Sequence, residues 1–344
     1  MYTPPVGVFI GAIETERLKT RLFALNHQQF YGEDSFVEFT LTHRRHTDDY
    51  LLDALTFDFP IAHETEVTAL GWSGRHHFSR DFALVYAGQL TADEIESTSL
   101  EQGPFTSRSY VKASLIPEYT YELDSANRLI ISAGGSFDDT NRNSNEFSPM
   151  AEIAWYHERK PYSRRVHFSY AESTQVPGYT AIGGSTTTGV FRSNPDLGPE
   201  TSRNLEIGSL WEAAYCSLES TAFYRWDDDL VDWTFEASNP FARSAKPVDI
   251  ETFGLEFIGT RRWNRLEAIA SYTYLSKNED FGAANIVGSF YALNYPEHRA
   301  TLGLIWDPLE WLELRIDNEW RSQRENQLRN SDDEAFFTHL GVSI

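Results

Sequence analysis

The chain has 344 residues, a formal net charge of −22 and an aromatic content of 14%. This charge argues against a nucleic-acid partner, because a phosphate backbone attracts lysine and arginine. The single cysteine, Cys216, excludes an internal disulfide framework. No apolar run approaches the roughly 18 residues that a membrane-spanning helix requires.

Alternation of apolar and polar residues dominates the chain, and it predicts β-strands because successive side chains of a strand point to opposite faces. We expect about fifteen strands, at 15–27, 36–46, 64–73, 78–90, 108–121, 128–138, 147–157, 162–172, 201–212, 215–227, 249–261, 265–275, 297–307, 310–320 and 335–344. Most are longer than the strand of about five or six residues that is usual in soluble proteins. They suit tilted strands that cross a bilayer in about 9–11 residues.

The segments between these strands alternate in length. Short turns are expected at 32–34, 73–78, 124–127, 157–161, 212–215, 262–264 and 307–310, and long polar loops at 46–63, 91–107, 139–146, 173–200, 228–248, 276–296 and 321–334. Short turns on one side and long loops on the other are typical of an outer-membrane barrel. The sequence therefore predicts an all-β fold, an antiparallel transmembrane β-barrel. A soluble propeller or solenoid is the alternative, although no repeat of fixed period is visible.

One stretch, NPDLGPETSRNLEIG at 194–208, resembles a signature in the barrel of TonB-dependent outer-membrane receptors. The matching residues are Asn194, Pro195, Leu197, Pro199, Glu200, Glu206 and Gly208. Later pieces resemble the strands that follow in that family, with Gly254 and Glu256 in one and Pro296 opening another. The resemblance covers residues 165–344 well, whereas residues 1–165 match only in general character.

The same stretch has a physical interpretation. Proline cannot donate to a β-ladder, so Pro195 and Pro199 must precede regular pairing. After them, alternation predicts one face toward lipid and one toward the lumen. The residues expected outward are Leu205, Ile207 and Trp211, and those expected inward are Asn204, Glu206 and Gly208. A charge on the lipid face near the midplane would cost up to about 4 kcal/mol, which favours an inward Glu206.

Receptors of this family are similar in having an N-terminal plug domain and a barrel of twenty-two strands. The resemblance therefore implies that residues 1–344 are a partial barrel domain, with about fifteen of those strands and no plug. It implies a place in the outer membrane of a Gram-negative bacterium. We expect a fragment that does not function alone, since an open sheet leaves unsatisfied backbone groups in hydrocarbon.

No motif for catalysis, nucleotide binding or zinc is present, so we expect neither an enzyme nor a bound cofactor. The acidic runs at 227–229 and 332–333 fit a solvated rim better than a calcium site. The expected partners are outer-membrane lipid, a small-molecule or metal-chelate ligand, and the TonB complex through the plug that this chain lacks.

Gly-rich loops with a few aromatic residues can fold over a ligand, and two of the long loops have this character. Their candidate ligand-binding residues are Tyr179, Phe191, Arg192, Phe281, Phe290 and Tyr291. The function expected is TonB-driven uptake of a scarce nutrient of the iron-siderophore, cobalamin or glycan class. The alternatives are a passive porin-like channel and a soluble β-rich binding or structural protein.

Overall fold

Antiparallel β-ladders run through most of the chain in the computed structural model, which describes residues 13–32, 34–53, 58–101, 106–143, 145–239, 242–326, 329 and 332–344. These residues form 17 strands, of which β9 (Phe191–Arg192) and β14 (Ile286–Gly288) are short pieces within loops. The long strands are β1 (Ile13–Phe30), β2 (Phe36–Asp53), β3 (Asp58–His77), β4 (Phe82–Ser97), β5 (Ser107–Glu122), β6 (Asn127–Thr140), β7 (Glu146–Arg159), β8 (Tyr162–Gln175), β10 (Glu200–Ala213), β11 (Cys216–Glu236), β12 (Arg243–Trp263), β13 (Leu266–Asp280), β15 (Pro296–Leu309), β16 (Leu312–Gln323) and β17 (Glu334–Ser343).

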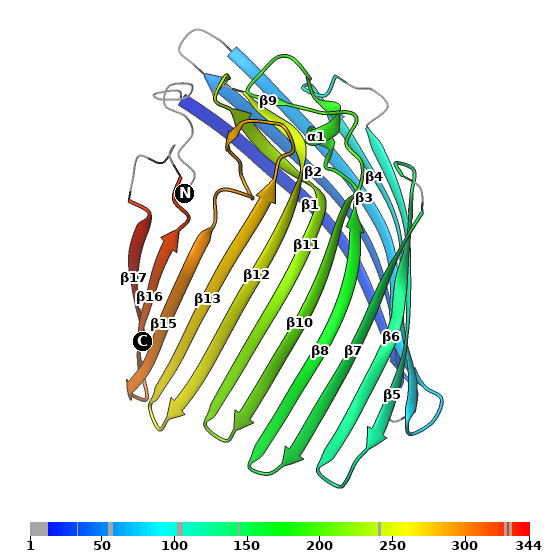
Figure 1. Ribbon diagram of the computed structural model, residues 1–344, viewed down its shortest axis with the longest axis vertical. Helices are drawn as coiled ribbons and strands as arrows, with labels where there is room; N and C mark the ends of the chain where they lie inside the picture. Colours follow the sequence, from blue (N-terminus) through cyan, green and yellow to red (C-terminus); the bar gives the residue numbers. More distant parts are fainter. Residues whose placement is uncertain are drawn as a thin grey trace.

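Each long strand pairs antiparallel with the next one along the chain, so the sheet is an up-and-down meander. The two short strands add to it at the loop end, where β9 runs parallel to β12 and β14 pairs with β11. Among the described residues no pairing joins β1 to β17, and the sheet curves into an open barrel wall (Figure 1). The predicted antiparallel barrel fold is confirmed.

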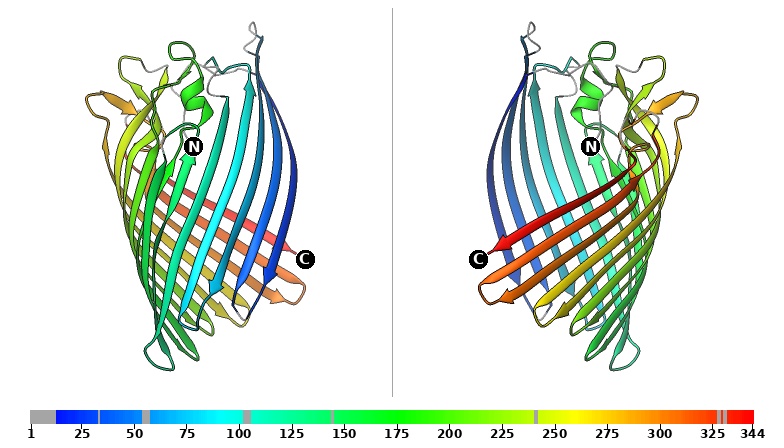
Figure 2. Two further views of the ribbon diagram at one scale, coloured as in Figure 1. Left: turned by 90° about the vertical axis from the view of Figure 1, so that its right-hand side faces the viewer. Right: turned by 90° about the vertical axis from the view of Figure 1, so that its left-hand side faces the viewer.

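The strands tilt around the wall, with tight turns at one end and longer connections at the other (Figure 2). The turns lie at 31–32 with 34–35, 78–81, 123–126, 160–161, 214–215, 264–265 and 310–311. The long connections carry the only helix of the described residues, α1 (Tyr179–Gly183). This sorting matches the expected division into short periplasmic turns and long outer loops.

Two of the expected loops are wrong in extent. Much of 46–63 is strand, because β2 continues to Asp53 and β3 begins at Asp58, and residues 54–57 lie outside the described part. Likewise most of 228–248 belongs to β11 and β12. Beyond the bilayer neither face of a hairpin meets hydrocarbon, so the alternation that marks a strand disappears while the backbone ladder continues.

Exposure along β5 is the reverse of that in a water-soluble strand. Apolar Val111, Leu115 and Tyr119 are exposed, and Leu115 has an exposed fraction of 58%. The residues between them, such as Lys112 and Glu118, are less exposed and face the inside of the wall. Apolar side chains on the open face are stable only against hydrocarbon. This strand therefore presents its outer face to lipid, which excludes the soluble alternative.

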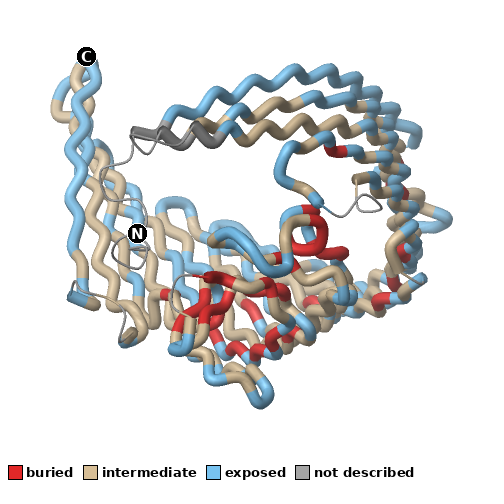
Figure 3. Tube along the Cα trace, turned by 90° about the horizontal axis from the view of Figure 1, so that it is seen from above, coloured by how far each residue is buried: buried red, intermediate tan, exposed pale blue. Residues whose placement is uncertain are grey.

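Buried residues gather at the loop end, where the connections pack on the extended strands (Figure 3). One apolar cluster contains Ala181, Val231 and Ala245, and a second contains Val248, Ile250 and Ala292. No helix in the described residues has the length and apolar character needed to cross a membrane. The packed part of the molecule is thus the cap of loops above the barrel wall.

Candidate functional site

The signature stretch forms the return of the long connection 176–199 into the sheet. The backbone N–H of Asn194 donates to the carbonyl of Ala181 at 2.7 Å, and the Asn194 side chain accepts the N–H of Asp196 at 3.1 Å. Leu197 packs against the cluster of Ala181, Val231 and Ala245. Pro199 then directly precedes Glu200, the first residue of β10. The signature therefore ties α1 to the start of the strand.

Further along β10 the two faces diverge in character. Ile207 has an exposed fraction of 54% on the outer face. Glu206 lies inside, where its Oε1 is 2.9 Å from Nε2 of His167 on β8. A side chain at Gly208 would overlap the imidazole of His167, so glycine provides the space in which that ring lies beside Glu206.

Tyr179 lies deep within the mouth of the barrel. Its ring is only 8% exposed, and its hydroxyl donates to the carboxylate of Asp93 on β4. The guanidinium of Arg108 lies 4.0 Å from the centre of the same ring. Burial and the neighbouring carboxylate of Asp93 raise the pKa of Tyr179. The residue stays a neutral donor and fixes α1 to the inner wall. It is therefore a buried anchor of the loop and not an exposed ligand contact.

Phe191 and Phe290, which come from separate loops, lie in one aromatic group. Their ring centres are 6.2 Å apart, and Trp233 meets Phe191 edge-on at 5.2 Å. The guanidinium of Arg243 lies 5.4 Å from the Phe191 ring and 5.6 Å from the Phe290 ring. Half of Phe191 is exposed, at 50%. This aromatic group gives the loop end a surface that can contact a ligand.

The other predicted site residues are dispersed around that group. Arg192 lies in β9, which pairs with Arg243 and Ser244 at the start of β12. Tyr291 is 53% exposed, next to Phe290. Phe281 instead packs against the cluster of Val248, Ile250 and Ala292. The structure thus brings four of the six candidates to one side of the mouth, while Tyr179 and Phe281 hold loops in place.

Asp232 organises the second loop, and sequence analysis did not single it out. Its side chain is fully buried, and its two carboxylate oxygens accept the backbone N–H groups of Phe290, Tyr291 and Ala292 at 2.9 to 3.2 Å. A buried carboxylate requires such partners, because an unpaired one would carry a large desolvation cost. No local pattern marks it, since its partners lie about sixty residues away in sequence.

The acidic run at 227–229 is also bound within the protein. Asp227 accepts from Ser202 at 2.7 Å and from Arg225 at 2.9 Å, and Asp228 pairs with Arg203. The described residues contain no cluster of three or more histidine, cysteine, aspartate or glutamate side chains that could hold a metal ion. The structure thus places Asp227 and Asp228 in ion pairs of the wall, whereas Asp229 is exposed.

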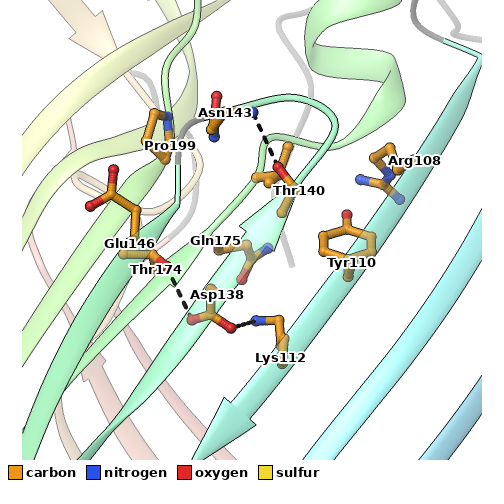
Figure 4. Close-up of a pocket in the computed structure, with 11 residues that line it drawn as sticks. Arg108, Tyr110, Lys112, Asp138, Thr140, Asn143, Glu146, Thr174, Gln175 and Pro199 are labelled. Carbon is orange, nitrogen blue, oxygen red and sulfur yellow. Dashed lines mark hydrogen bonds and ion pairs between the residues drawn. The ribbon is translucent and has the colours of Figure 1, made fainter.

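A pocket of about 330 Å³ opens on the inner wall near the loop end (Figure 4). It lies at the upper ends of β5, β6, β7 and β8, beside the start of β10. Its lining residues are Arg108, Tyr110, Lys112, Asp138, Thr140, Asn143, Glu146, Thr174, Gln175, Val176 and Pro199. Apart from Pro199, sequence analysis identified none of them, because they come together only when five strands align.

Three of the four charged residues that line this pocket are held in ion pairs. Arg108 makes two hydrogen bonds to Asp93, at 2.9 and 3.1 Å, and Lys112 lies 3.2 Å from Asp138. The hydroxyl of Thr174 donates to the other oxygen of Asp138 at 3.4 Å. Ion pairs of the same kind line other parts of the inner face, including Arg165 with Glu152 and Arg299 with Glu319. The inner wall is therefore polar but largely charge-compensated.

Comparison with known proteins identifies a family. The family model described as "TonB dependent receptor-like, beta-barrel" matches residues 14–343. No curated protein sequence matches the chain. Solved structures with a similar fold include the siderophore receptor PirA from Pseudomonas aeruginosa, with a TM-score of 0.68 at 14% identity, which aligns over 96% of this chain and 58% of that one.

Two further solved structures have the same fold. The copper transporter OprC has a TM-score of 0.66 at 13% identity, over 96% of this chain and 57% of that one. The iron transporter FrpB from Neisseria meningitidis has a TM-score of 0.65 at 11% identity, over 95% of this chain and 55% of that one. The chain thus spans less than two thirds of the length of each protein.

Proposed function

Because the chain belongs to the TonB-dependent receptor family, whose barrels lie in the outer membrane, we propose that it forms the barrel of a receptor for TonB-driven uptake of a scarce nutrient. Nothing in this role requires a chemical reaction. Loops at the outer end capture the ligand, and the barrel provides its path through the membrane.

One observation carries this proposal: the curved sheet has an apolar outer face and a polar, ion-paired inner face, and packed loops line one end of it (Figure 3). Outer-facing Leu115 and Ile207 are more than half exposed. Inner-facing residues pair across neighbouring strands, as Arg165 does with Glu152. Such a wall provides a hydrated route across hydrocarbon, while the loops that Tyr179 and Asp232 hold in place form a defined entrance.

We assign the first ligand contact to the aromatic group at the mouth. Phe191 and Tyr291 present exposed ring surface there, Phe290 lies against Phe191, and Arg243 holds a cation over both phenylalanine rings. Arg192, the next residue of β9, is a further contact that we propose. Tyr179 and Phe281 support this surface from within. The ligand classes consistent with such loops are an iron-siderophore, a cobalamin or a glycan. TonB is the proposed energy-supplying partner, acting through the plug domain that receptors of this family carry.

The test is a comparison of uptake in the source bacterium with and without the gene. The receptor proposal predicts that deletion abolishes growth on one limiting nutrient at low concentration, and that disruption of TonB gives the same defect without an additive effect. Complementation with a Phe191→Ala, Phe290→Ala double variant should restore growth only at a raised nutrient concentration. Growth that depends on the gene but not on TonB would overturn the proposal in favour of a passive channel.

A further inference from the structure

We propose that the inner-wall pocket of Figure 4 binds an uncharged, hydroxyl-rich ligand, such as a saccharide unit. This inference rests on the proposed uptake function and specifies the chemistry of the molecule taken up. It concerns the wall below the mouth, a site distinct from the aromatic group formed by Phe191 and Phe290.

Charge is the first reason. Both cations of the pocket are already neutralised, Arg108 by Asp93 and Lys112 by Asp138. The carboxylate of Glu146 has no hydrogen-bonding or ionic partner among the described residues. The lining residues carry two cations and two carboxylates, so the lining has no net charge and neither cation is free. An anionic chelate would meet repulsion from the unpaired Glu146 carboxylate, and it would have to break an existing pair to gain a cation.

The second reason is the supply of unused hydrogen-bonding groups. Besides Glu146, the side-chain amides of Asn143 and Gln175 and the hydroxyl of Tyr110 have no hydrogen-bond partner in the described residues. An amide offers both donors and acceptors, a phenol can do either, and a carboxylate accepts. Ligand hydroxyls, which also donate and accept, are the groups that complement this mixture.

Shape is the third reason. The volume of about 330 Å³ lies at the small end of ligand pockets, which typically measure ~300–1,000 Å³. The aromatic ring of Tyr110 forms part of the wall, with the Arg108 guanidinium 5.7 Å from its centre. An aromatic face gives the apolar side of a sugar ring a contact surface, while the polar groups around it receive the hydroxyls.

Rigidity of the pocket lining is the fourth reason. Asp138 is held by Lys112 and Thr174, and the hydroxyl of Thr140 accepts the N–H groups of Arg142 and Asn143 at 3.1 Å. Arg108 is fixed by Asp93 and also donates to the carbonyl of Pro177 at 3.3 Å. The ion-paired part of the lining is therefore preorganised, and binding does not have to order those side chains.

The experiment uses the full chain folded in detergent and measures binding by isothermal titration calorimetry. The neutral probes are maltose, cellobiose and N,N′-diacetylchitobiose, and the anionic probe is digalacturonate. We expect at least one neutral disaccharide to bind and digalacturonate to bind at least about tenfold more weakly, since its carboxylates find no unpaired cation and face the Glu146 carboxylate. Tyr110→Ala and Gln175→Ala should each weaken the neutral ligand about tenfold, as expected for one lost polar or ring contact.

The matched control is Gln323→Ala, which removes the same side chain from β16, away from the pocket, and should leave the affinity unchanged. Glu146→Gln removes the unpaired carboxylate and should bring digalacturonate to within about threefold of the neutral ligand. Absence of pocket-dependent binding by all three neutral probes, or equal binding of digalacturonate by the unaltered chain, would overturn the inference. The growth test above separates the proposals, because TonB-dependent uptake of a charged nutrient would refute this pocket assignment and leave the receptor function intact.

Discussion

The hydroxyl of Tyr179 in α1 donates a hydrogen bond to the carboxylate of Asp93, which lies 86 residues earlier on β4. Arg108 pairs with the same carboxylate and stacks on the Tyr179 ring. Three residues from three elements thus fix the connection 176–199 to the inner wall. The loop is part of the barrel mouth and not a free segment above it.

Removing either the Tyr179 donor or the Asp93 acceptor should loosen the loop 176–199. Tyr179→Phe keeps the ring on Arg108 and should cost about 1 kcal/mol, the net value of one hydrogen bond. Asp93→Ala leaves both Tyr179 and Arg108 without their acceptor and should cost more. Limited proteolysis of 176–199 in outer-membrane vesicles would measure the change. Cleavage of Asp93→Ala at the rate of the unaltered chain would show that the contact does not hold the loop.

The loop containing Phe290 depends on a single buried carboxylate. Asp232→Ala would deprive three backbone N–H groups of their acceptor, at about 1–3 kcal/mol for each buried donor left unpaired. We expect rapid hydrogen exchange at Phe290, Tyr291 and Ala292, with the lower strands unaffected. Asp232→Asn retains one acceptor oxygen, so its exchange rates at these amides should lie between those of the unaltered chain and those of Asp232→Ala. Unchanged protection of these amides in Asp232→Ala would contradict this account.

Gly254 and Phe223 face each other across β11 and β12 on the inner wall. A Cβ at Gly254 would enter the Phe223 ring, so Gly254→Ala should cost about 1–3 kcal/mol through overpacking. In a Phe223→Ala background the same substitution should be nearly neutral, because the ring is gone. Urea unfolding of the four proteins gives the coupling energy. Additive effects of the two substitutions would show that the ring and the glycine do not interact.

In the turn 123–126, at the opposite end of the wall, the contribution of Asp124 to the free energy of unfolding should depend on pH. Hydrogen bonds from the backbone of Ala126 and the side chain of Asn127 lower the pKa of Asp124 below its ordinary 3.8. A lowered folded-state pKa stabilises the fold above the unfolded pKa, and this contribution is lost as pH falls through the folded value. The stability difference between the unaltered chain and Asp124→Ala should therefore be constant near neutrality and shrink below about pH 4. A difference that grows on acidification would contradict the assignment.

Much of the wall could be predicted from sequence because its chemistry repeats every two residues. Leu205, Glu206 and Ile207 alternate, and the bilayer on one side with the lumen on the other makes that alternation necessary. Phe223 breaks the pattern of β11, and its reason is visible only in the structure: it covers Gly254 on the neighbouring strand. Such cross-strand compensation depends on register, which one strand alone does not specify.

The cap of loops was far less predictable. Its contacts join residues distant in sequence, as Asp232 with Ala292, and polar loops leave no periodic pattern. The pocket residues Tyr110, Asn143 and Gln175 belong to three separate segments that meet only through the curvature of the wall. Aromatic residues in Gly-rich loops could be recognised as candidates, yet whether each one faces the mouth or anchors a loop depends on tertiary packing.

The central claim is that the exposed apolar face of this wall meets lipid, and two adjacent residues of β5 test it most directly. Leu115 points outward with 58% of its surface exposed, while Ser114 points inward. The free energies of unfolding of Leu115→Arg and Ser114→Arg can be measured by urea titration in phospholipid vesicles. Leu115→Arg should be the less stable of the two. Leu115→Arg should lose about 2–4 kcal/mol, as a charge in hydrocarbon does, whereas Ser114→Arg should lose less than about 1 kcal/mol. Equal stability of the two variants, or a greater loss for Ser114→Arg, would contradict the membrane barrel.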